Sequence, residues 1–308
     1  MVKIYESVTE LVGNTPLVKL KNLAKTHKIK ANILAKCEFF NPTFSVKDRA
    51  ALNMLEKVPF TKINKDTIFV EATSGNTGIG LAAMCAAKGY KLVIIMPENM
   101  SEERIKLIRH FGAEIILTPA DEGMRGAIQK ANMLAQKNKN VIIINQFENP
   151  ANPEAHTFST AVELLEQTGT DIDAIVCGVG TSGTLTGIAK TLKTCLPDLY
   201  VVAVEPQESQ VLKGENSASH KIEGIGANFI PHFFDASIVD EIIPVASDDA
   251  ISIAKDTARI EGLGVGISAG AALKAAIELG KRPQMNKKNI VVILPDAIER
   301  YLSLSYFS

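Results

Sequence analysis

The stretch AIVCGVGTSGTLTG (174–187) decides the fold. It begins with an apolar run the size of a β-strand, continues as a loop rich in glycine and hydroxyl groups, and leads into a helical segment. The apolar run lacks the polar alternation of a strand with one wet face, so it predicts a strand buried on both faces, as in a parallel sheet. A parallel strand followed by a helix is the repeating unit of α/β proteins.

The same pattern of a short apolar run and a longer amphipathic segment recurs along the chain. Segments 78–89, 101–112 and 247–262 read as helices because each ends at a glycine, and the last two begin at a serine suited to be the N-cap. This alternation predicts an α/β fold. The other strand-like runs are 31–37, 67–72, 91–97, 113–119, 141–146, 200–206 and 289–295.

The length of 308 residues predicts roughly two domains. The best internal boundary is ENPANPEAH (148–156), where Asn and Pro cluster between a strand-like run and a helical segment. The stretch 207–240 has no strong periodicity and is too long for an ordinary connection. We therefore expect a functional or partly structured loop there.

Composition and charge argue against several classes of protein. There are 33 Lys and Arg against 34 Asp and Glu, so the net charge of −1 gives no reason to expect nucleic acid or an acidic membrane as a partner. The apolar runs are strand-sized and the N-terminal residues lack an unbroken apolar stretch, so we expect neither a membrane span nor a signal peptide. The cysteines form no C-x-x-C pair and the histidines show no metal-ligand spacing. We therefore expect a cytoplasmic soluble protein with reduced thiols and no metal.

Two polar loops carry residues suited to catalysis and to binding an anion. In NPTFSVKDRAA (41–51), an S-x-x-D pattern predicts a helix start with Lys47 in the first turn, where the helix dipole favours a neutral, nucleophilic amine. The alternative is an ordinary capped helix with a solvated lysine. In EATSGNTGIGLA (71–82), hydroxyl and amide groups precede a helix N-terminus that favours a carboxylate, although a polar turn that only caps the helix has the same pattern.

A third loop, CGVGTSGTLTG (177–187), contains G-x-G-x-x-G, and Glu205 ends the next strand-like run. This spacing is typical of a dinucleotide-binding site. A phosphate monoester site is the alternative, because Thr181, Ser182 and Thr184 add hydroxyl donors to the backbone N–H groups. The loop alone leaves both open.

The fourth loop, GVGISAGAAL (264–273), places Ser268 before an apolar helix. Its hydroxyl either faces a pocket or only caps the helix, and the N-cap is the simpler interpretation. The chain contains neither a G-x-S-x-G elbow of a hydrolase nor a G-x-x-x-x-G-K-[ST] nucleotide loop.

Together these segments resemble the cysteine synthase/cystathionine β-synthase family of fold type II pyridoxal-phosphate enzymes. The resemblance implies a two-domain, tryptophan synthase β-like fold in which each domain is a mostly parallel sheet flanked by helices. It runs the whole length of the chain. Its motifs are LVGNTPLVKL (11–20), FFNPTFSVKDR (39–49), ATSGNTGIGLA (72–82), NQFENPANPEAH (145–156), GVGTSGTLTG (178–187), HKIEGIGANFIP (220–231), GISAGAA (266–272) and PDAIERYLS (295–303).

The resemblance implies pyridoxal 5'-phosphate as the cofactor and Lys47 as the catalytic lysine that binds it. It favours the phosphate alternative for the third loop, and it places Asn76 beside the ring hydroxyl and Ser268 at the pyridine nitrogen. The implied phosphate-binding residues are Gly180, Thr181, Ser182, Gly183 and Thr184. The implied substrate-binding residues are Thr73, Ser74, Gly75, Asn76, Thr77, Gln146, Gly224, Ile225 and Gly226.

The implied reaction is a β-replacement that makes L-cysteine from O-acetyl-L-serine and sulfide through an aminoacrylate. The length leaves no room for the haem-binding or regulatory regions usual in cystathionine β-synthases, and no arginine between 207 and 231 could hold a phosphoserine. KCEFFN (36–41) is nevertheless similar to the cystathionine-forming branch, so cystathionine β-synthase-type or H₂S-producing activity on serine or cysteine with homocysteine or another thiol is an alternative. A NAD-dependent oxidoreductase is the alternative from a different class.

The resemblance also implies how the chain is divided and with what it assembles. Residues 1–40 and 151–308 would form a larger domain that binds the cofactor phosphate, and residues 41–150 a smaller, mobile domain that binds the substrate carboxylate. A homodimer is implied, and serine acetyltransferase is a candidate partner. Three departures bear on the substrate: Ser182 and Asn228 stand where the family often has glycine, and Ala297-Ile298 replaces a smaller pair.

Overall fold

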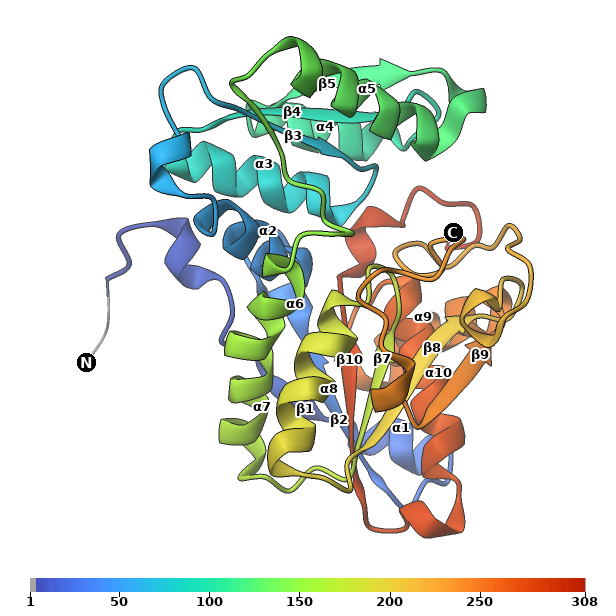
Figure 1. Cartoon of the computed structure of the whole chain (residues 1–308). Helices are drawn as coiled ribbons and strands as arrows, with labels where there is room; N and C mark the ends of the chain where they lie inside the picture. The colour runs from blue at the N-terminus through green and yellow to red at the C-terminus, as the bar shows by residue number, and fades with distance from the viewer. Residues whose placement is uncertain (1–3, 308) are drawn as a thin grey trace. The chain divides into compact units, whose positions relative to one another are not determined.

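The computed structural model describes residues 4–307 (Figure 1). The chain divides into two compact units. The smaller unit comprises Lys47–Asn152 with the N-terminal segment up to Val12, and the larger comprises Gly13–Val46 with the residues from Pro153 onward. Relative to the predicted domain limits, the changes of unit fall at 46/47 and 152/153, and the N-terminal segment groups with the smaller unit.

The smaller unit contains a parallel sheet in the strand order β5-β4-β3-β6. Helices cover both faces of this sheet: α2, α3 and α4 share one apolar core with Phe69 and Ile94, and α5 shares another with Val70. The elements are α2 (Lys47–Glu56), β3 (Ile68–Ala72), α3 (Asn76–Lys88), β4 (Lys91–Pro97), α4 (Glu102–His110), β5 (Glu114–Thr118), α5 (Gly123–Lys137) and β6 (Val141–Ile143).

The larger unit contains a six-stranded sheet in the order β1-β2-β10-β7-β8-β9 over its described residues, antiparallel only between β1 and β2. Helices α1, α9 and α10 pack on one face, and α7 and α8 pack on the other. The elements are β1 (Leu17–Lys19), α1 (Lys21–Thr26), β2 (Asn32–Cys37), α7 (Ala161–Thr168), β7 (Ala174–Gly178), α8 (Gly183–Cys195), β8 (Tyr200–Pro206), β9 (Glu241–Val245), α9 (Ser247–Glu261), α10 (Ile267–Gly280) and β10 (Asn289–Leu294). Helix α6 (Ala151–Ala155) contains the change of unit at 152/153.

Each strand predicted from an apolar run is present, and the fold is α/β with mostly parallel sheets, as expected. Two edge strands, β1 and β9, escaped prediction. Strand β1 has only three residues, and β9 contains Pro244, which weakens a strand pattern and is tolerated at a sheet edge. The stretch 207–240 holds only the short 3-10 helices Val211–Lys213 and Ala236–Ile238, which agrees with a partly structured loop.

The predicted helix ends are largely confirmed. Ser101 caps α4 by accepting a hydrogen bond from the Arg104 N–H, and Gly89 and Gly262 end α3 and α9 in the left-handed conformation. The prediction that Ser247 caps α9 is wrong. Ala246 is the N-cap, because the Ser247 hydroxyl instead accepts a hydrogen bond from the Lys221 N–H at 3.0 Å.

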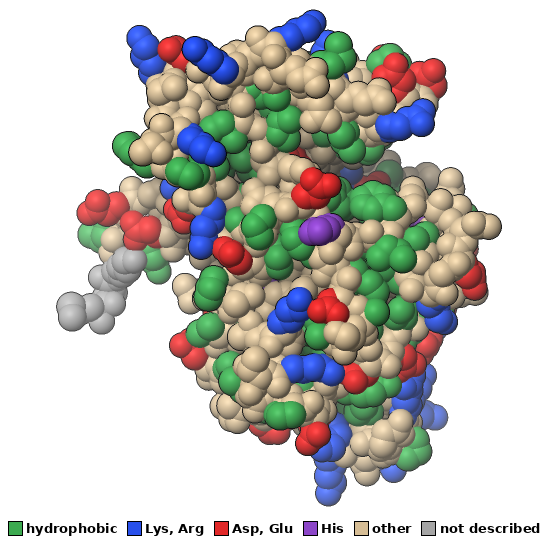
Figure 2. Space-filling view, viewed as in Figure 1, with side chains coloured by type: hydrophobic (Ala, Val, Ile, Leu, Met, Phe, Trp, Pro, Cys, Tyr) green, Lys and Arg blue, Asp and Glu red, His purple; other side chains and the backbone are tan. Residues whose placement is uncertain are grey.

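Three further features bear on membranes, charged partners and metals. No helix within residues 4–307 is long and apolar enough to cross a membrane. On the face shown in Figure 2, acidic and basic side chains are interspersed rather than gathered in one large patch of either sign. Among the described residues, no cluster of His, Cys, Asp and Glu has the arrangement of a metal site.

Candidate active site

In the smaller unit, the loop after β3 and the residues after β6 come together. Helix α3 begins at Asn76, directly after this loop, and Gly75 is its N-cap without a side-chain hydrogen bond. The buried Thr77 hydroxyl donates to the Gln146 side-chain oxygen at 2.6 Å. Because backbone N–H groups at a helix start favour an anion, residues 73–77 and Gln146 form a polar site suited to a small carboxylate.

Lys47 belongs to the same unit. It is the first residue of α2 and is half-buried, which confirms the prediction that it lies in the first turn of a helix. Helix α2 packs closely on α3 at Gly80, where an added Cβ would lie 3.4 Å from the Lys47 carbonyl carbon. The start of α2 is thereby fixed against the helix that follows residues 73–75, the loop suited to a carboxylate.

In the larger unit, the loop between β7 and α8 is tightly built. An added Cβ on Gly180 would lie 2.4 Å from the Gly224 carbonyl oxygen, so this position requires glycine. Ser182, the N-cap of α8, has φ +65 and makes no capping hydrogen bond through its side chain. The Gly183 N–H, the first of α8, instead donates to the Thr181 hydroxyl at 3.3 Å. The N–H groups at the start of a helix favour a phosphate.

Residues 224–226 and Ser268 lie next to this loop. The Gly226 N–H donates to the Val179 carbonyl at 3.0 Å, and the Ser268 hydroxyl lies 3.9 Å from where a Gly224 Cβ would be. The N-cap interpretation of Ser268 is wrong, because α10 begins at Ile267 with Gly266 as its N-cap. Ser268 is instead a buried residue of the first turn, with its hydroxyl near the Gly224 segment.

Glu205 does not serve as the acidic residue of a dinucleotide site. Its side chain is buried and accepts a hydrogen bond from the Leu212 N–H at 2.8 Å. Burial also raises the pKa of this carboxyl. A carboxylate that already accepts a hydrogen bond from its own loop is not available to a ribose hydroxyl. Glu205 therefore does not supply the acidic residue that a dinucleotide-binding site needs.

His156 is a site residue that sequence reasoning missed. It is buried, and one ring nitrogen lies 3.2 Å from the Thr184 hydroxyl while the other lies 2.9 Å from the Thr160 hydroxyl. It begins a π-helical turn, His156–Thr160, a local distortion that is frequent at functional sites. The contact with Thr184 crosses 28 positions, so no local sequence pattern could have indicated it.

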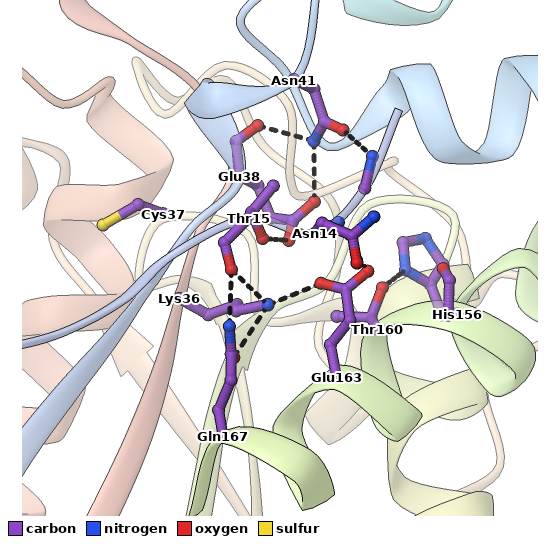
Figure 3. A network of polar contacts seen from close by, with 12 residues as sticks. Asn14, Thr15, Lys36, Cys37, Glu38, Asn41, His156, Thr160, Glu163 and Gln167 are labelled. Atoms are coloured by element: carbon purple, nitrogen blue, oxygen red, sulfur yellow. Dashed lines mark hydrogen bonds and ion pairs between the residues drawn. The ribbon is translucent and has the colours of Figure 1, made fainter. Parts of the chain in front are cut away.

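A buried polar network supports the segment that leads to Lys47 (Figure 3). The Lys36 ammonium is fully buried and donates to the Glu163 carboxylate at 2.6 Å and to the Thr15 carbonyl at 2.7 Å. The Thr15 hydroxyl donates to Glu38, whose carboxylate accepts from the Asn41 amide at 3.0 Å. A buried charge is tolerated when paired and hydrogen-bonded, as here. The network fixes residues 36–41, the start of the segment ending at Lys47.

The predicted site residues thus fall into two groups. Lys47, residues 73–77 and Gln146 belong to the smaller unit, and residues 180–184, 224–226 and Ser268 belong to the larger. The fold and these loops define the class: an α/β protein with one loop suited to a phosphate monoester and one suited to a small carboxylate.

Comparison with known proteins gives the family. The family model described as pyridoxal-phosphate dependent enzyme matches residues 8–296, and the chain belongs to this family. Cysteine synthase B of Campylobacter jejuni is 47% identical over 99% of this chain and 100% of its own length. A cysteine synthase structure from Entamoeba histolytica has a TM-score of 0.96 with 41% identity, covering 99% of this chain and 91% of the other. A hydrogen sulfide-producing enzyme from Fusobacterium nucleatum has a TM-score of 0.93 with 42% identity, covering 98% and 99%.

Pyridoxal 5'-phosphate is therefore the cofactor, and the residues of the larger unit fit it. The start of α8 and the hydroxyls of Thr181, Ser182 and Thr184 suit a phosphate dianion. Gly180 packs so closely against Gly224 that it has no room for a side chain, so this part of the loop consists of backbone alone. Ser268 offers a neutral hydroxyl from the first turn of α10.

Proposed function

We propose that this enzyme makes L-cysteine from O-acetyl-L-serine and sulfide. The observation that carries the proposal is the 47% identity to a cysteine synthase along nearly the whole of both chains. Two glycine loops of different character support it. One suits a phosphate, as the cofactor requires, and the other suits the carboxylate that an amino-acid substrate brings.

Lys47 has two tasks in this proposal. When bound, pyridoxal phosphate draws electrons from Cα of the amino acid and makes its proton acidic. Lys47 would hold the cofactor covalently until the substrate amine displaces it, and the freed Lys47 amine would then take the α-proton as a general base. Acetate leaves Cβ with the electron pair of the C–O bond, sulfide forms the new C–S bond, and Lys47 returns the proton to Cα.

The remaining residues bind and orient. Residues 73–77 and Gln146 would hold the substrate carboxylate, with Asn76 beside the cofactor ring, and residues 180–184 would hold the cofactor phosphate. Ser268 would meet the pyridine nitrogen with a neutral hydroxyl. Such a partner stabilises a positive ring nitrogen less than a carboxylate would, which suits elimination and replacement better than a long-lived carbanion. Residues 224–226 would line the entrance.

Release of H₂S from cysteine, or use of a thiol other than sulfide, is the second candidate function. The similarity to the hydrogen sulfide-producing enzyme of F. nucleatum favours it. Asn228 belongs to the same segment as residues 224–226 and has φ +63, a conformation that glycine adopts freely and asparagine tolerates. In this proposal, a side chain at the position where the family often has glycine would alter the preference for the second substrate.

We further propose that the enzyme is a homodimer. Phe158 and Val162, four residues apart along the chain, are 69% and 41% exposed, which supports a protein contact on this face of the larger unit. A complex with serine acetyltransferase, the predicted mobility of the smaller domain and the cytoplasmic location stay predictions. Analytical ultracentrifugation, alone and with the acetyltransferase, tests both assemblies.

Absorbance spectroscopy tests the reaction. The purified protein should absorb in the visible region, change its spectrum on addition of O-acetyl-L-serine, and return to the starting spectrum with sulfide as cysteine appears. A protein that ignores O-acetyl-L-serine but releases sulfide from cysteine would contradict the first function and establish the second.

Lys47→Ala is the variant that tests the catalytic assignment. Turnover should fall by about 10³-fold or more, because both the covalent attachment and the general base are removed. Borohydride reduction followed by peptide mass mapping should locate the cofactor on Lys47 in the wild-type protein. Lys36→Ala is not a suitable control, because Lys36 holds the buried network together. The control is Lys106→Ala, because Lys106 is exposed and pairs with Glu102 on the surface. Lys106→Ala should keep full activity.

A further inference from the structure

A buried carboxylate lies under the carboxylate-binding loop of the smaller unit, and the reaction itself does not require it. Glu71 is 2% exposed and is the second-last residue of β3, two positions before the loop that begins at Thr73. It lies in the middle of the sheet, between β4 and β6. Carboxylates are almost never fully buried without a partner, so its contacts have to explain its presence.

Its contacts are all with the turn that carries Gln146. One oxygen of Glu71 accepts the Asn145 N–H at 2.7 Å, and the other accepts the Gln146 N–H at 3.3 Å. The Gln146 side chain also favours the ionised form of the carboxyl. Burial raises the pKa of Glu71 to about 7, against the lowering by these hydrogen bonds.

The turn at 145–146 needs such support. Strand β6 leaves the sheet here, and Asn145 has φ +55, a left-handed conformation that costs energy in a residue with a side chain. The two N–H groups released from the strand ladder point at Glu71. Without an acceptor they would be buried and unpaired, so Glu71 stabilises the conformation from which the Gln146 side chain projects.

Gln146 is then held from two sides. Thr77 donates to its side-chain oxygen at 2.6 Å, and Glu71 accepts its backbone N–H at 3.3 Å. The side-chain amide nitrogen carries two hydrogens, which can meet a substrate carboxylate. We propose that Glu71 is a positioning residue for the reaction: it orients Gln146 to bind the carboxylate of the amino-acid substrate. This inference rests on the function proposed above.

The test is Glu71→Gln, which keeps the shape and removes the charge, assayed about 1.5 pH units above the pKa of about 7, where the wild-type carboxyl is ionised. The KM for O-acetyl-L-serine should rise roughly tenfold, because charge-assisted hydrogen bonds to the turn are lost. The KM for sulfide and the affinity for the cofactor should stay unchanged. Glu205→Gln is the matched control. Like Glu71, Glu205 is a buried glutamate near the end of a strand and accepts a hydrogen bond from a loop N–H, but it belongs to the larger unit. It should leave both KM values unchanged.

A double-mutant cycle separates positioning from a general loss of stability. Because Glu71 and Thr77 act on the same side chain, Glu71→Gln and Thr77→Val together should raise KM by less than the product of the single effects. Multiplying effects, or a KM unchanged in Glu71→Gln, would overturn the inference. If Glu71→Gln does not fold, Glu71→Asp keeps the charge on a shorter side chain and should raise the same KM by a few-fold; an unchanged KM there would likewise overturn it. A wild-type protein without turnover of O-acetyl-L-serine would instead overturn the proposed function.

Discussion

The loop between β3 and α3 and the loop between β7 and α8 have the same plan but differ in how tightly they are built. Each follows a buried parallel strand and opens a helix whose N-cap residue makes no capping hydrogen bond through its side chain. An added Cβ on Gly180 would meet the Gly224 carbonyl oxygen at 2.4 Å, whereas an added Cβ on Gly75 would have no described neighbour within 4 Å. The β7–α8 loop is packed against backbone, and the β3–α3 loop has open space at Gly75.

The difference matches two kinds of ligand. A cofactor that stays bound calls for a rigid cradle in which backbone N–H groups are already in place. A substrate that enters and leaves in each turnover needs a loop with room above it, held from below by hydrogen bonds such as that between Thr77 and Gln146. The comparison predicts that substitutions in the two loops affect different binding constants.

Gly180→Ala should have the largest effect. Its methyl group would collide with backbone, which cannot move aside as a side chain can, at a cost of about 1–3 kcal/mol. The affinity for pyridoxal phosphate should therefore fall roughly 10- to 100-fold. Titration of the cofactor-free protein with pyridoxal phosphate, followed by absorbance, measures this. Gly75→Ala, with φ −120 and free space, is the matched control and should bind the cofactor normally. Equal losses in both variants would contradict the distinction between the loops.

Thr77→Val should have an intermediate effect, on the binding of the substrate and not on that of the cofactor. It keeps the shape of the buried side chain but leaves the Gln146 oxygen without its donor, which costs about 1–3 kcal/mol. The KM for O-acetyl-L-serine should rise about tenfold at this cost, with the cofactor affinity unchanged. Steady-state kinetics at saturating sulfide measure it. Thr257→Val removes an equally buried hydroxyl from α9, where it bonds only the Ile253 carbonyl, and should leave this KM unaltered. A lower cofactor affinity in Thr77→Val alone would show that the two sites are not separable.

The sequence predicted the architecture well because parallel strands buried on both faces leave uninterrupted apolar runs. It predicted Lys47 at a helix start for a similar reason, since the capping pattern is local. Glu71, His156 and Lys36 escaped because their partners are distant in the chain: Glu71 bonds a residue 74 positions away, and Lys36 bonds one 127 positions away. A buried charge within a strand-like run was the available signal, but the sequence could not say what it bonds.

Ser182→Gly should have the smallest effect, because two contributions oppose each other. Ser182 has φ +65, so glycine would relieve about 1–2 kcal/mol of strain. Glycine also gives up the hydroxyl contact with Thr186 at 3.0 Å and makes the unfolded chain more flexible, which together cost about as much. The Tm should therefore stay within about 3 °C of wild type, as differential scanning calorimetry can measure. Asn228→Gly makes the same kind of change at a left-handed position, φ +63, away from the phosphate loop, and should leave the cofactor affinity unchanged.

A several-fold weaker cofactor affinity in Ser182→Gly alone would mean that the serine hydroxyl adds a donor that glycine cannot supply. Unchanged affinity would mean that the backbone of the rigid loop binds the phosphate by itself, which widens the contrast with the substrate loop and its dependence on the Thr77 side chain.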